Sequence, residues 1–109
     1  MTDRDLLVLA AKAAGMRLMR TPDVGGVFVL DGREWNPLED DGDALRLAVS
    51  LHICIEFGYC ADDAPIVYCG RSEYRRDWPQ MANFPDPYKA TRRAIVRAAA
   101  EIGRQERDK

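Results

Sequence analysis

The chain has 109 residues, 47% of them hydrophobic and 31% charged, and a formal net charge of −2 from 18 acidic and 16 basic residues. This length suits one core, so residues 1–109 are expected to form a single domain. The near balance of charge argues against binding to nucleic acid or to an anionic membrane. No apolar run reaches the roughly 18–20 residues of a membrane span, and the acidic start MTDRDLL is unlike a signal sequence, so we expect a cytoplasmic protein.

Residues 1–14 are predicted to form the first helix. Thr2 and Asp5 have the spacing of a capping box, and Gly15 ends the helical pattern. The apolar residues recur at helical spacing, which predicts an amphipathic helix laid on a sheet.

Two short strand-compatible runs follow, at 16–20 and 27–30. The six residues between them, TPDVGG, are rich in turn formers. This arrangement predicts a β-hairpin.

The next segment is an irregular entry into a second helix. Pro37 fixes the backbone direction, so that Trp35 can close one end of the core. Asp40 or Asp41 is predicted to cap a helix that ends near residue 51. Because its residues are almost wholly apolar, we expect this helix to be buried around most of its circumference.

The acidic residues at the start of this helix allow two interpretations. Glu39, Asp40, Asp41 and Asp43 could form a divalent-metal cluster, but they lack the pattern of an EF-hand loop. Helix capping accounts for the same carboxylates. We therefore expect no metal site here, and we place Asp43 on the polar edge of the helix.

Two further strands, at 52–57 and 65–69, alternate apolar residues with period two and should pair antiparallel across the loop 58–64. An irregular segment at 70–87 leads to the last helix, predicted from residue 88 to about residue 105. Asp86 is its expected cap, with proline as the first helical residue. The order α-β-β-α-β-β-α predicts an α+β fold: a three-layer α/β/α sandwich in which a small, mostly antiparallel sheet of about four strands is covered by three helices.

The cysteines and the single histidine give no clear catalytic or metal site. Cys54, Cys60 and Cys69 lack the paired spacing of zinc knuckles, and their odd number favours reduced thiols in the core. A pair of His52 with Cys54 is the most specific enzymatic alternative, but no activating motif accompanies it. We expect a protein that is not an enzyme and that uses no cofactor.

The irregular segment from Arg71 to Trp78 is the best ligand-binding candidate. Its arginines and aromatic residues suit a phosphate-bearing ligand or a nucleobase. Alternatively, Trp78 fills the core and the arginines face water. The candidate ligand-binding residues, which include two on the last helix, are Arg71, Tyr74, Arg75, Arg76, Trp78, Arg93 and Arg97.

Two sequence blocks carry a family resemblance. WNPL at 35–38, followed by DDGDALRLA at 40–48, and ATRRAIVRAA at 90–99 resemble the phage ABA-sandwich domain family. The resemblance covers about residues 33–103. It implies an α/β/α layered fold and an accessory role in a phage or prophage, and it carries no catalytic residues to transfer.

The first functional hypothesis is therefore a phage accessory protein in the bacterial host cytoplasm. It would bind a host or phage protein during takeover or defence evasion. The alternative is a small-ligand or nucleotide binder that uses the Arg71–Trp78 loop and the last helix. Self-association is left open.

Overall fold

A computed structural model describes residues 2–15, 19–20, 28–30, 32–71, 80–82 and 85–107. The elements are α1 (Asp3–Ala13), β1 (Met19–Arg20), β2 (Phe28–Leu30), β3 (Arg33–Glu34), α2 (Asp41–Leu51), β4 (Cys54–Tyr59), β5 (Pro65–Gly70), β6 (Gln80–Ala82) and α3 (Pro87–Arg107). The α+β class, the three helices and the order of helices and hairpins are confirmed. One short strand, β3 or β6, is added to each hairpin.

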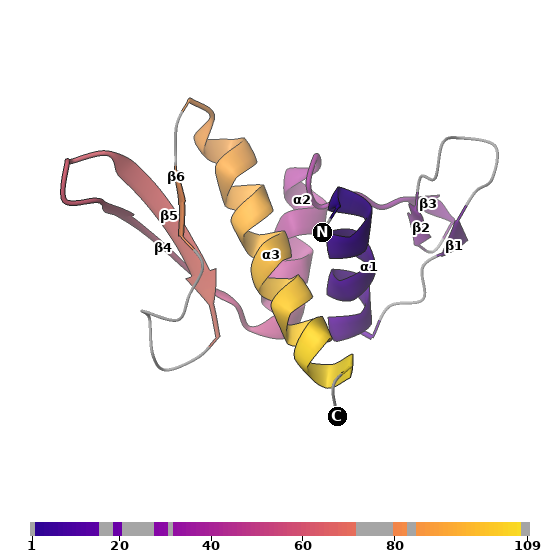
Figure 1. The fold of residues 1–109 in the computed structure, drawn as a ribbon. Helices are drawn as coiled ribbons and strands as arrows, with labels where there is room; N and C mark the ends of the chain where they lie inside the picture. The colour runs from indigo at the N-terminus through magenta and orange to yellow at the C-terminus, as the bar shows by residue number, and fades with distance from the viewer. Residues whose placement is uncertain are drawn as a thin grey trace.

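The strands form two sheets in place of the single sheet that the sequence suggested. One sheet has the order β1-β2-β3 and the other β4-β5-β6, and every neighbouring pair is antiparallel. The three helices lie between the two sheets, with β4-β5-β6 beside α3 and β1-β2-β3 at the far side of α1 (Figure 1). The layer order therefore differs from helix, sheet, helix, because the helices bury their apolar faces mainly against one another.

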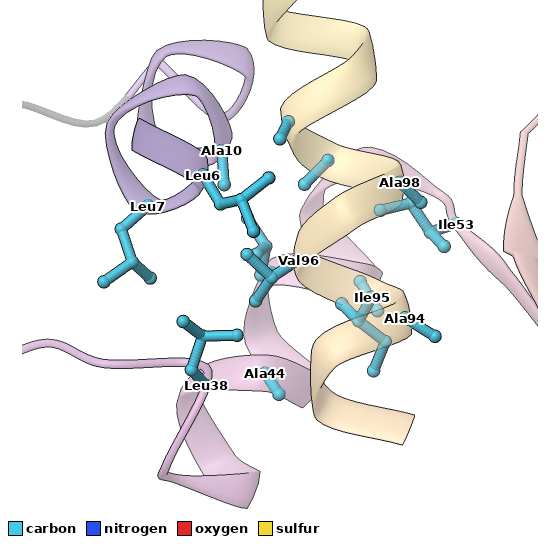
Figure 2. Close-up of a cluster of buried hydrophobic side chains, with 14 of the residues drawn as sticks. Leu6, Leu7, Ala10, Leu38, Ala44, Ile53, Ala94, Ile95, Val96 and Ala98 are labelled. Carbon is cyan, nitrogen blue, oxygen red and sulfur yellow. The ribbon is translucent and has the colours of Figure 1, made fainter. Parts of the chain in front are cut away.

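Small side chains on α3 make this helix contact possible. Ala94, Val96 and Ala99 are fully buried, and Ile95 is nearly so. Leu6 of α1 lies toward Val96 on one side, whereas Ile53 lies near Ala98 on another (Figure 2). Since alanine lets neighbouring backbones approach closely, α3 can contact helices and a sheet around most of its circumference.

Among the described residues, the first helix packs mainly on α3 rather than on a sheet, which corrects the prediction for α1. Its capping box is present: the Thr2 hydroxyl accepts from the Asp5 N–H at 3.1 Å, and the Asp5 carboxylate accepts from the Thr2 N–H at 3.1 Å. These bonds hold the pKa of Asp5 below its ordinary value. The two helices approach each other closely where Gly103 of α3 faces the Leu9 backbone of α1.

A buried carboxylate anchors the entry to α2. Asp43 is 5% exposed; its Oδ2 accepts from the Asn36 N–H at 3.0 Å and its Oδ1 from the Arg46 guanidinium at 2.8 Å. Its own N–H donates to Asp40 at 2.8 Å, so Asp40 is the cap. The sequence placed Asp43 on a polar edge, but these bonds allow the residue to be buried. Trp35, which directly precedes Asn36 in the chain, is 3% exposed and belongs to the core.

The predicted start of the last helix is confirmed. The Asp86 carboxylate accepts from the N–H groups of Tyr88 and Lys89, both at 3.1 Å.

Within the described ranges, none of the helices is long and apolar enough to cross a membrane.

Candidate protein-binding surface

Helix α2 exposes two large apolar side chains. Leu45 is 60% exposed and Val49 is 66% exposed, although five other residues of the same helix are buried. Residues four apart lie one above the other on a helix, so these two side chains form one patch, which we call the Leu45–Val49 patch. The expected burial of α2 around most of its circumference is therefore wrong, because α3 covers only one side of it.

Both ends of α2 are fixed to the rest of the fold. At its start, Arg92 of α3 donates to the Leu38 carbonyl at 2.9 Å and to the Asp41 carboxylate at 2.7 Å. At its end, the guanidinium of Arg71, the residue that follows β5, donates to the Leu51 carbonyl at 3.2 Å, and His52 takes the left-handed conformation, with φ 55°. A helix held at both ends presents its exposed side chains without further ordering, which lowers the entropic cost of binding.

Charged groups border the patch and are already neutralised by internal pairs. Asp41, one turn before Leu45, pairs with Arg92. Arg46, next to Leu45, pairs with Asp43 at 2.8 Å and lies 3.9 Å from Asp40. A partner would therefore meet apolar side chains inside a rim of opposite charges, which is the usual arrangement of a protein interface.

Most of the predicted ligand-binding loop lies outside the described residues. Tyr74, Arg75, Arg76 and Trp78 all belong to the part of the chain that is not described. Arg71 is described, and its guanidinium donates to the Leu51 carbonyl at the end of α2 at 3.2 Å. This bond satisfies a carbonyl at the helix C-terminus, so Arg71 has a structural contact.

The two predicted residues on the last helix lie elsewhere. Arg93 pairs with Asp3 at the start of α1 at 2.9 Å, and Arg97 is exposed. Arg71 contacts the end of α2, whereas Arg93 contacts the beginning of α1, so the structure does not gather the described candidates around one ligand site.

The cysteines have different environments. Cys54 is exposed, Cys60 is half-buried and Cys69 is buried. Burial, together with the nearby Cys54, raises the pKa of the Cys69 thiol to about 12. Among the described residues, no group of three His, Cys, Asp or Glu side chains could hold a metal ion, and no hydrogen bond joins His52 to a cysteine.

Thiol labelling should separate these environments. We expect N-ethylmaleimide at pH 8 to modify Cys54 rapidly and to leave Cys69 unmodified until the protein is unfolded. A pKa raised from 9.0 to about 12 makes the thiolate fraction about a thousandfold lower, and burial also excludes the reagent. Peptide mass spectrometry measures both sites, and equal labelling rates in the native protein would contradict the buried placement of Cys69.

The Leu45–Val49 patch was not among the predicted site residues. Nearly every position from Ala44 to Leu51 is apolar, so helical periodicity could not distinguish the outer face from the core. The only signals were Arg46 and Ser50, the two polar residues of this stretch, which are both exposed.

Comparison of the chain with protein-family models, curated proteins and solved structures found no match.

Proposed function

We propose that this chain is a phage or prophage accessory protein of the bacterial cytoplasm that acts by binding a host or phage protein, without catalysis. The Leu45–Val49 patch is the contact surface. The exposure of these two side chains, 60% and 66%, on a helix fixed at both ends is the observation that carries the proposal. The phage assignment rests on the resemblance of residues 35–48 and 90–99 to the phage ABA-sandwich family.

The energetics of the patch favour a helix-mediated contact. Complete burial of a leucine or valine side chain contributes roughly 1.5–3 kcal/mol, so two neighbouring anchors can supply a useful part of a binding energy. An i, i+4 pair of apolar anchors is the pattern by which a helix binds an apolar groove on its partner. The partner is therefore expected to present such a groove.

Affinity capture from infected host lysate tests the proposal. The tagged wild-type chain should recover one specific protein, and the double variant L45K/V49K should lose it, because two charges would enter the apolar contact. Lysine is a good helix former, so both substitutions should leave the fold intact, which circular dichroism can verify.

The matched control is F57K, which changes an equally exposed apolar side chain on β4. This variant should recover the same protein as the wild type. Repeated capture with no specific protein would contradict the proposed function, and a partner retained by L45K/V49K would contradict the proposed surface.

A further inference from the structure

Strand β4 lies at the open edge of its sheet. Among the described residues it pairs with β5 alone, in six consecutive pairs from Cys54 with Gly70 to Tyr59 with Pro65, without a bulge. Proteins usually protect such edges with lysine, proline or a bulge, because unpaired N–H and C=O groups can recruit another strand. In β4 the only charged residue is Glu56, and proline is absent.

The hydrogen-bond pattern identifies the backbone groups that face the open edge. Just beyond β4, the Cys60 N–H donates to the Ala64 carbonyl at 2.9 Å, toward the β5 side. In an antiparallel ladder this direction alternates, so the even-numbered residues of β4 also point toward β5. Ile55, Phe57 and Tyr59 therefore direct their N–H and C=O groups to the open edge.

The side chains of the same three residues share one face of the sheet. Ile55 and Phe57 pair with Cys69 and Val67, which are fully buried on the face that packs on the helices. Near the edge this face is open: Phe57 is 63% exposed and Tyr59 is 74% exposed. Within the described part of the chain, the unpaired backbone groups thus belong to Ile55, Phe57 and Tyr59, and the last two also carry exposed aromatic side chains.

We propose that β4 pairs antiparallel with β4 of a second copy of this chain, about a twofold axis through Phe57, to form one continuous six-stranded sheet. In this register each Phe57 lies opposite the second copy's Phe57, and Ile55 lies opposite the second copy's Tyr59. Every outward N–H and C=O of the three residues in each copy gains a partner. This self-association is independent of the Leu45–Val49 patch.

Neighbouring registers fit less well. An axis through Glu56 would place two carboxylates directly opposite each other, which is destabilising. An axis through Gly58 would pair Ile55 with Ala61 of the turn, beyond the end of the strand. With the axis at Phe57, Glu56 lies opposite Gly58, and an aromatic pair lies at the centre.

The exposed area predicts a reversible dimer. With about 150–250 Å² for a whole aromatic side chain, the exposed parts of Phe57 and Tyr59 supply roughly 200–350 Å² per copy. A stable interface needs about 800 Å² per partner, so this area and the backbone pairing together should give a dimer in equilibrium with the monomer. The degree of association should therefore rise with concentration.

Two native cysteines report the register. The proposed axis places Cys54 opposite the second copy's Cys60, at a pair without hydrogen bonds where Cα atoms lie about 4.5 Å apart, within the range for a disulfide. Within one chain these residues are six positions apart on an extended strand, about 20 Å. A Cys54–Cys60 disulfide must therefore join two copies.

Oxidation of the full chain with diamide tests this pairing. Diamide takes two electrons and two protons from two thiols, leaving a disulfide and the hydrazine form of the reagent. We expect a covalent dimer that contains the Cys54–Cys60 peptide pair. It should disappear in C54S and persist in C69S. Failure to form this disulfide, or a predominant Cys54–Cys54 pairing, would overturn the register.

Sedimentation equilibrium tests the association itself. The average mass of the reduced wild type should rise toward the dimer with concentration, and F57K should weaken association at least tenfold, because two lysines would meet at the axis. V49K, at a comparably exposed residue of α2, should associate like the wild type. A monomer at every concentration, or a dimer of equal strength in F57K, would overturn the proposal.

Discussion

Replacing Trp35 with alanine should lower the free energy of unfolding by about 3–5 kcal/mol, the range for loss of a large aromatic side chain from a core. Trp35 is 3% exposed, and its backbone N–H donates to the Phe28 carbonyl at 2.9 Å. The backbone of Trp35 is thus bonded to β2, and its indole belongs to the buried core. Removal of its ring would leave a cavity there, which urea denaturation followed by circular dichroism would detect as a lower midpoint.

The matched control for Trp35 is an exposed aromatic residue. Y88A changes a side chain that is 70% exposed and should alter the stability by less than about 1 kcal/mol. If W35A were as stable as Y88A, Trp35 would not close the core.

Replacing Gly103 with alanine should have the second large effect, a net loss of about 2 kcal/mol, because overpacking near the top of its usual range exceeds the gain in helix propensity. A Cβ at this position would overlap the carbonyl oxygen of Leu9 and lie 2.9 Å from its carbonyl carbon. Backbone atoms cannot move aside as a flexible side chain can, so α1 and α3 would have to separate, and overpacking of this kind costs about 1–3 kcal/mol or more. Alanine's better helix propensity returns only about 1 kcal/mol.

G58A is the matched glycine control, measured in the same denaturation experiment. A Cβ on Gly58 would make an ordinary contact with the Tyr68 ring at 3.6 Å. The stability of G58A should therefore stay within about 1 kcal/mol of the wild type. An unchanged or more stable G103A would contradict the close packing of α1 on α3.

The parts of the fold predicted correctly are those set by local interactions. Thr2 with Asp5, Asp40 and Asp86 each accept hydrogen bonds from N–H groups within three residues, so their role is visible in the sequence. The two hairpins follow from short apolar runs that flank turn residues.

The arrangement of layers depends on distant contacts that no local pattern encodes. Gly103 reads as an ordinary helix position, yet it permits the contact with Leu9 that places α1 on α3. Strand β3 has only two residues, too few for a periodic signal. Which strands share a sheet also depends on distant contacts, so the sequence did not indicate that the strands form two sheets.

The candidate surface was missed for a related reason. A sequence that is apolar on all sides of a helix predicts burial, but burial also needs a neighbour on every side, and α2 has its helix neighbour on one side. Leu45 and Val49 are exposed because α3 contacts the opposite face. Which apolar side chains of a helix are exposed to a partner therefore depends on the elements that pack around that helix. The sequence pattern alone does not show this packing.

The measurement that tests the central claim most directly compares the affinity for the captured partner with the free energy of unfolding in L45K/V49K. The proposed function predicts that the affinity falls at least tenfold, while the unfolding free energy stays within about 1 kcal/mol of the wild type, because both side chains face solvent in the free protein. An unchanged affinity would contradict the claim that this patch of α2 binds the partner. A large loss of stability would show that Leu45 and Val49 belong to the core.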